Sequence, residues 1–135
     1  MGFYKRLNYI TDKEGDNDQT IFENIKILSV EYDKDVYYWG EKVIGIVTIQ
    51  NNSNNQENLW LGYSLLDPLN NWIDIHPKNV LLSSKETATI TMEYILEDGM
   101  ITGEYSAVFA LWDSFPIDEN SMRITDIEID KGFRI

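Results

Sequence analysis

The sequence predicts an all-β protein, an antiparallel β-sandwich of about seven strands with a short N-terminal extension. Three observations support this fold class. Strand-like segments follow one another from residue 24 onward, at the roughly 8–12-residue spacing that sandwiches show. The connectors are rich in Asn, Asp, Gly and Pro, and no long amphipathic helical pattern interrupts them. The 135 residues suit one domain, so we expect an extension over 1–23 and a sandwich domain over 24–135.

The first three strands are predicted over Asn24–Tyr32, Lys42–Gln50 and Asn58–Asp67. The first is β-branched and apolar, and its alternation breaks near Ile27 and Leu28, which indicates a β-bulge. The second is apolar on both faces, so we expect it at the centre of a sheet. The third places alternate apolar residues on one face, namely Leu59, Leu61, Tyr63 and Leu65.

Later segments continue the pattern. Two short strands are expected over Asn71–His76 and Asn79–Leu82. The clearest strand is Glu86–Ile95, whose apolar residues alternate with threonines as in a half-buried antiparallel strand. Gly103–Trp112 also alternates, and the short segments 122–129 and 132–135 close the chain.

One tyrosine favours an immunoglobulin-like topology. Tyr105 begins the penultimate strand, directly after a turn that contains Asp98, Gly99 and Gly103. From this position its hydroxyl can fold back onto the preceding turn, as in a tyrosine corner. An ordinary core tyrosine is the alternative.

Longer stretches carry a family resemblance: "ILSVEYDKDVYYWGEKVIGIVTIQNNS", "LWLGYSLLDPLNNWIDI", "VLLSSKETATITMEYIL" and "GEYSAVFALWDSFP". In this order they resemble bacterial and archaeal Ig-like accessory domains, including those related to cell adhesion, over about residues 24–135. The resemblance implies a sandwich that acts as a spacer or binds a ligand. The opening is also similar to Bacillus-type intracellular proteinase inhibitors.

Composition restricts the chemistry. The chain lacks Cys and has a single His, His76, which excludes disulfides, thiolate metal sites and two-histidine sites within one chain. His76 precedes Pro77, and we expect it in a surface loop at a strand end rather than as a catalytic base. A formal charge of −12 disfavours nucleic acid and anionic lipid, and suits cations, basic partners or neutral ligands. No apolar run predicts membrane insertion.

The segment "DKEGDNDQTIFE" (Asp12–Glu23) is a candidate metal site. Its oxygen-bearing side chains stand at the ligand positions of an EF-hand calcium loop: Asp12, Glu14, Asp16, Asp18, Thr20 and Glu23. Strand-like sequence follows where an EF-hand needs a helix, so a looser calcium or magnesium site with oxygen ligands and an exposed acidic tail are the alternatives. We expect no cofactor other than this calcium.

Aromatic residues are the candidate ligand-binding residues. Trp60 begins one strand and Trp112 ends another, so antiparallel pairing would place the two indoles together on an outer sheet face as a platform for a sugar or an apolar partner. Alternatively, another segment or subunit covers them. Tyr37, Tyr38 and Trp39 crowd a second position, a turn before the central strand. The other interpretation of this turn is that Trp39 caps the end of the core, while the two tyrosines point alternately into the core and out to solvent.

We therefore expect a non-enzymatic binding or structural module that engages a protein or a carbohydrate through exposed aromatic residues. One alternative is a cytoplasmic proteinase inhibitor that acts through Asn51–Asn58 or Tyr37–Gly40, and another is a calcium-stabilised surface domain. An exposed edge strand could pair in a homodimer. The domain is expected in the cytoplasm if the chain is complete, and outside the cell if it is an excised piece. Asn51 also begins an N-glycosylation sequon, Asn-Asn-Ser.

Overall fold

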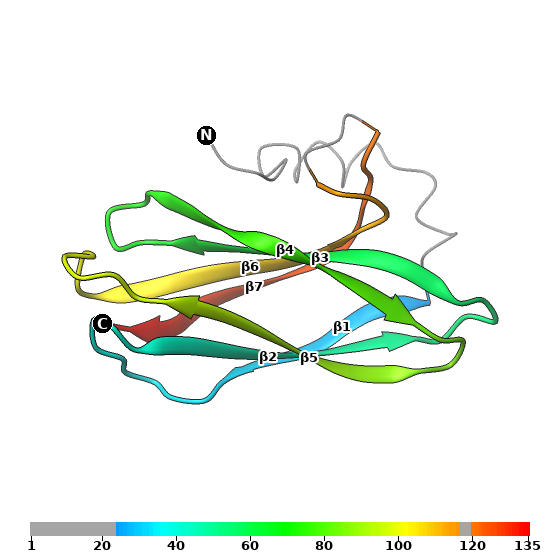
Figure 1. Cartoon of the computed structure of the whole chain (residues 1–135), viewed down its shortest axis with the longest axis horizontal. Coiled ribbons are helices and arrows are strands. Elements are labelled where there is room, and N and C mark those ends of the chain that lie inside the picture. The colour runs from blue at the N-terminus through cyan, green and yellow to red at the C-terminus, as the bar shows by residue number, and fades with distance from the viewer. Residues whose placement is uncertain (1–23, 117–119) are drawn as a thin grey trace.

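The fold is an antiparallel β-sandwich in a computed structural model that describes residues 24–116 and 120–135. Within these ranges the strands, labelled in Figure 1, are β1 (Ile25–Tyr32), β2 (Lys42–Asn51), β3 (Glu57–Leu66), β4 (Trp72–Leu82), β5 (Thr87–Ile95), β6 (Glu104–Trp112) and β7 (Arg123–Arg134).

Two sheets stack face to face. A three-stranded sheet has the order β1-β2-β5, and a four-stranded sheet has the order β4-β3-β6-β7. All neighbouring strands within the sheets are antiparallel, and Figure 1 shows the two layers one above the other. The predicted all-β antiparallel sandwich of seven strands is confirmed. So is the central position of β2, which pairs with β1 on one side and β5 on the other.

Alternation of apolar side chains forms the core between the sheets. The inward residues of β3 are all buried, as the sequence predicted, and those of β2 and β6 meet them. The rings of Tyr63 and Phe109 stack with their centroids 4.2 Å apart, at the middle of the pairing between β3 and β6. Such offset-stacked pairs add to the burial of apolar area that holds the layers together.

The predicted bulge in β1 is confirmed, because the pairing of β1 with β2 shifts between Ile27 and Ser29. In β4, however, the two short strands predicted around Pro77 are one continuous strand. Its pairing with β3 shifts between Leu61 and Tyr63, so that His76 and Pro77 lie opposite a single residue. Proline is tolerated at a bulge in an edge strand because no ladder hydrogen bond is required of it there.

This bulge also corrects the expected position of His76. Its side chain is exposed, as predicted, but it lies within β4 and not in a loop at a strand end. Similarly, the two short C-terminal segments belong to one strand, β7, which carries irregularities in its pairing with β6.

The tyrosine corner is present. The hydroxyl of Tyr105 donates a hydrogen bond to the Ile101 carbonyl at 2.6 Å. The ring is buried and stacks on Phe133 with centroids 5.2 Å apart. The bond fixes the loop between β5 and β6 against the start of β6.

Asn51 organises the loop at the other end of β2. Its side chain is fully buried, and its amide nitrogen donates to the carbonyls of Asn55 (2.8 Å) and Ser83 (3.0 Å). Its side-chain oxygen accepts from the backbone N–H and the hydroxyl of Ser53. The sequon at Asn51 is therefore occupied by an internal hydrogen-bond network, which is incompatible with glycan attachment in the folded domain.

Replacing Tyr105 with Phe is expected to lower the free energy of unfolding by about 1 kcal/mol, because the Ile101 carbonyl loses its donor while the ring packing stays. Urea denaturation at an unchanged m-value measures this. Tyr38→Phe is the matched control, since the Tyr38 side chain is 71% exposed, and it should leave the midpoint unchanged. Equal midpoints for Tyr105→Phe and wild type would contradict the role of the corner.

Asn51→Ala is expected to destabilise the domain by roughly 2 kcal/mol or more, because several buried backbone groups lose their partner together. Asn52→Ala, at the exposed neighbouring position, should change stability by less than about 0.5 kcal/mol. Thermal denaturation of both variants under identical conditions checks the difference. A loss at Asn52 as large as that at Asn51 would show that the buried amide is not the organising group.

Stability is expected to fall in alkaline solution. Burial is the main cause that raises the pKa of Tyr63 and Tyr32 well above the ordinary value of 10.0, and burial with the hydrogen bond to Asp33 raises the pKa of Tyr37 to about 12. The unfolded chain therefore releases these protons first, so stability present below pH 10 is lost as the pH rises toward 12.

Denaturant unfolding at a series of pH values from 8 to 12 measures this loss. Tyr63→Phe removes one of the titrating groups, so its stability should fall less steeply with pH than that of the wild type. Identical slopes for the two proteins would contradict the assignment.

Candidate functional site

Exposed apolar side chains gather at one end of the sandwich. This is the end where β1, β3 and β5 finish and β2, β4 and β6 begin, at the left of Figure 1. Of the large apolar side chains exposed within the described ranges, most lie here: Val36, Tyr38, Trp39, Leu69, Trp72 and Ile95. We call this set the aromatic end. An apolar cluster spread over several loops is typical of an interaction surface.

Tyr37 anchors the loop between β1 and β2. Its ring is fully buried and packs edge-on against Phe133, with centroids 5.4 Å apart. Its backbone N–H donates to the Arg134 carbonyl, and the Arg134 N–H donates to the Asp35 carbonyl, both at 2.9 Å. Its hydroxyl donates to the Asp33 carboxylate. The structure thus corrects the expectation that Tyr37 belongs to the ligand-binding surface, because its side chain is part of the core.

Tyr38 and Trp39 follow this anchor and point outward, with side chains 71% and 47% exposed. The Trp39 indole N–H donates to the Met100 carbonyl at 3.0 Å, which ties the ring to the loop between β5 and β6. The Tyr38 backbone N–H donates to Glu41 at 2.8 Å. Gly40 then turns the chain with φ 87°, and its N–H donates to the Leu96 carbonyl. Both aromatic residues are therefore displayed on a segment whose backbone is held in place.

An open groove of about 560 Å³ lies beside these two rings. It is lined by Tyr38, Trp39, Asp98, Thr102 and Ile135. The volume lies within the range of ligand-binding clefts, and most of the lining is apolar, with the Asp98 carboxylate and the hydroxyls of Tyr38 and Thr102 as its polar groups. The sequence indicated Tyr38 and Trp39 as binding residues. It did not indicate the other three lining residues, because strand pairing brings them to the groove from distant parts of the chain: Asp98, Thr102 and Ile135.

The second predicted aromatic site has the expected pairing but not the expected exposure. Trp60 and Trp112 are direct cross-strand partners in β3 and β6. Trp112, however, is only 1% exposed, and Trp60 is half-buried against Phe115, with ring centroids 5.1 Å apart. The expected open platform of two indoles is therefore not present on this face. Phe115, which follows β6 and packs against Trp60, is a contact that the sequence did not indicate.

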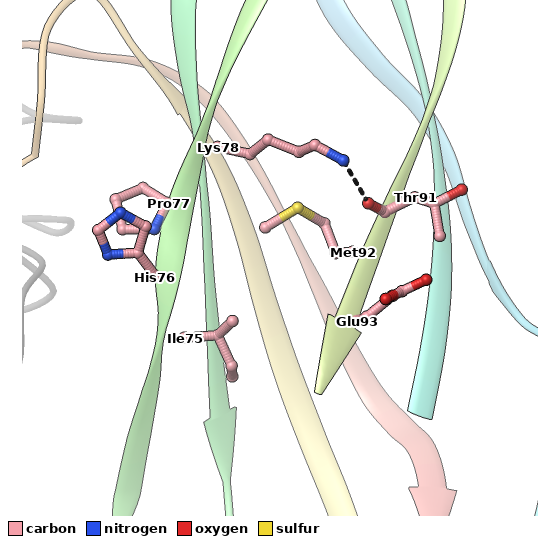
Figure 2. A pocket seen from close by; sticks show the side chains of 7 residues that line it. All are labelled: Ile75, His76, Pro77, Lys78, Thr91, Met92 and Glu93. Carbon is pink, nitrogen blue, oxygen red and sulfur yellow. Dashed lines mark hydrogen bonds between the residues drawn. The ribbon is translucent and has the colours of Figure 1, made fainter. Parts of the chain in front are cut away.

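A smaller groove of about 330 Å³ opens along one side of the sandwich, between the edge strands β4 and β5. Figure 2 shows Ile75 and Met92 at its base, each from one of the two sheets. The Lys78 ammonium reaches across from β4 and donates to the Thr91 carbonyl of β5 at 3.1 Å. This bond occupies part of the free edge of β5, a known protection against edge-to-edge pairing.

The metal prediction lies outside the described residues. Asp12, Glu14, Asp16, Asp18 and Glu23 all precede residue 24. Over 24–116 and 120–135 there is no group of three or more His, Cys, Asp or Glu residues placed to hold a metal ion. Nor does that part of the chain contain a helix long and apolar enough to cross a membrane.

Comparisons with known proteins support the fold. No protein-family model and no curated protein sequence matches the chain. Among solved structures, the alkylpurine DNA glycosylase AlkC of Pseudomonas fluorescens, bound to DNA, is similar at a TM-score of 0.60 and 14% identity, over 82% of this chain and 30% of AlkC.

Two further solved structures are smaller. A CARDB domain from Pyrococcus furiosus, in complex with di-metal ions, matches at a TM-score of 0.54 and 16% identity, over 83% of this chain and 96% of that domain. The sporulation control protein Spo0M of Bacillus subtilis matches at 0.50 and 18%, over 82% of this chain and 49% of Spo0M. The chain thus spans less than half of AlkC and of Spo0M. At these identities the likeness establishes the β-sandwich fold alone, in keeping with the resemblance to Ig-like accessory domains.

Proposed function

We propose that the domain is a non-enzymatic binding module that docks a partner protein on the aromatic end. The observation that carries this proposal is the exposure of Tyr38 and Trp39 on a segment held by the buried Tyr37. Exposed aromatic side chains of this kind dominate the energetics of many protein interfaces. They supply a large contact area at a low conformational cost, because each has only two side-chain torsions.

Rigidity of the display supports the proposal. The hydrogen bonds of Tyr37, Trp39 and Gly40 tie the loop between β1 and β2 to β7 and to the loop between β5 and β6. A surface that is ordered before binding loses less entropy when a partner arrives. The order of the loop therefore favours recognition over a flexible linker role.

A protein fits this surface better than a carbohydrate does. The exposed apolar side chains come from several segments, and Val36, Leu69, Trp72 and Ile95 lie outside the lining of the groove. A sugar site generally combines an aromatic face with several hydrogen-bonding side chains, whereas the polar groups of this groove are the Asp98 carboxylate and the hydroxyls of Tyr38 and Thr102.

Proteinase inhibition through residues 51–58 is the second candidate. The Asn51 network holds this exposed loop in one conformation, with Asn51 bonded to Ser53, Asn55 and Ser83. A pre-organised loop is what an inhibitor presents to a protease cleft. Stoichiometric inhibition of a protease by the domain, lost in Asn51→Ala and retained in Trp39→Ala, would favour this candidate over docking at the aromatic end.

Crosslinking tests the proposed function. A photoreactive phenylalanine analogue placed at Tyr38 should crosslink a protein partner in cells, whereas the same analogue at Leu81, which is exposed at the opposite end of β4, should not. The partner identified by mass spectrometry is then titrated with the purified domain. Trp39→Ala should weaken its binding by a factor of about 10 or more, as expected for an interface aromatic, and Leu81→Ala should not.

Two results would contradict the proposal. One is equal crosslinking from positions 38 and 81. The other is an unchanged dissociation constant for Trp39→Ala when circular dichroism shows that the variant is folded.

A further inference from the structure

We propose that the groove beside Tyr38 and Trp39 receives a basic side chain of the partner, an arginine or a lysine, held between the aromatic rings and the Asp98 carboxylate. This inference rests on the proposed function and adds the chemistry of the group that the groove selects. It follows from the lining of the groove, from the pairing of nearby charges and from a similar arrangement inside the domain.

The lining combines aromatic rings with a free carboxylate. Tyr38 and Trp39 contribute the rings, and Asp98 contributes the only ionised side chain among the five lining residues. The indole N–H of Trp39 is already bonded to the Met100 carbonyl, so the indole offers the incoming group its π surface rather than its donor. A cation over an aromatic face is attracted by the ring quadrupole.

Asp98 forms no ion pair within the described parts of the chain, whereas three basic side chains at this end are paired with other carboxylates. Lys34 bonds Glu41 at 2.9 Å, Lys42 lies 3.3 Å from Glu93, and Arg134 lies 3.5 Å from Glu104.

The charge of Asp98 is therefore left to be balanced from outside. A net charge of −12 over the whole chain further attracts a basic partner during approach.

The domain already uses this chemistry once. The Lys34 ammonium lies 5.2 Å from the centroid of the Tyr37 ring and pairs at the same time with the Glu41 carboxylate. One cation thus contacts an aromatic ring and a carboxylate from the same loop. The groove next to it presents the same two kinds of group, with the position of the cation open.

The charge of Asp98 distinguishes the binding of a basic side chain from the binding of an apolar one. An uncharged side chain could cover the same rings, but it would remove water from Asp98 without supplying a partner, which costs free energy. A basic side chain supplies both the apolar stem for the rings and the charge for the carboxylate. Citrulline has nearly the shape of arginine but no charge, with a carbonyl oxygen in place of one guanidinium nitrogen, which makes the two suitable probes.

The test uses N-acetyl-arginine methylamide and N-acetyl-citrulline methylamide, titrated into the ¹⁵N-labelled domain and followed by NMR. The arginine derivative should shift the Trp39 indole N–H resonance and the Asp98 and Thr102 amides, and should bind at least roughly fivefold more tightly than the citrulline derivative. Its affinity should fall as the salt concentration rises. Asp98→Asn should reduce the arginine affinity to that of citrulline, whereas Glu31→Gln, which removes an exposed charge on β1, should not.

Equal affinities for the two derivatives, no shift of the groove resonances with either, or full arginine affinity in Asp98→Asn would each overturn the inference. None of these results decides the proposed function, which depends on whether Trp39→Ala weakens the crosslinked partner. Loss of the partner's binding in Trp39→Ala but not in Asp98→Asn would therefore leave docking at the aromatic end in place and remove the basic group.

Discussion

The insertion of Tyr37 into the core is the constraint on which the aromatic end depends. Its ring packs against Phe133, and its backbone joins the end of β7 through the Arg134 carbonyl. Because neighbouring side chains on an extended segment point in opposite directions, burial of this ring directs the next residue outward. The contact of Tyr37 with Phe133 thus contributes to the core and also directs the next ring toward solvent. In this way a short loop presents exposed aromatic rings and stays ordered.

Both ends of the sandwich use a buried side chain to hold a loop. At the aromatic end the anchors are Tyr37 and the tyrosine corner of Tyr105. At the other end the anchor is Asn51, whose amide satisfies backbone groups from neighbouring loops. The two ends differ in what they display, since polar residues surround Asn51 while apolar ones follow Tyr37. This difference is the reason for proposing recognition at the aromatic end, with the Asn51 loop as the competing site.

Local patterns were sufficient to predict most of the strands. Alternation along residues 86–95 and the broken alternation near Ile27 both reflect contacts within one strand or between neighbours in a sheet. The continuity of β4 through Pro77 was missed because proline signals a break locally, while an edge-strand bulge accommodates it.

The candidate site was only partly predictable. Tyr38 and Trp39 stood out by type, but whether Tyr37 turns inward depends on Phe133, almost 100 residues away in the sequence. The burial of Trp112 likewise depends on tertiary covering of its sheet face, so pairing with Trp60 could be predicted and exposure could not. The most direct test of the anchoring role of Tyr37 is amide hydrogen exchange measured residue by residue. We expect the Tyr37 and Arg134 amides to exchange as slowly as amides in β6. Exchange at the rate of an unstructured loop, while β6 stays protected, would show that Tyr37 does not anchor this end.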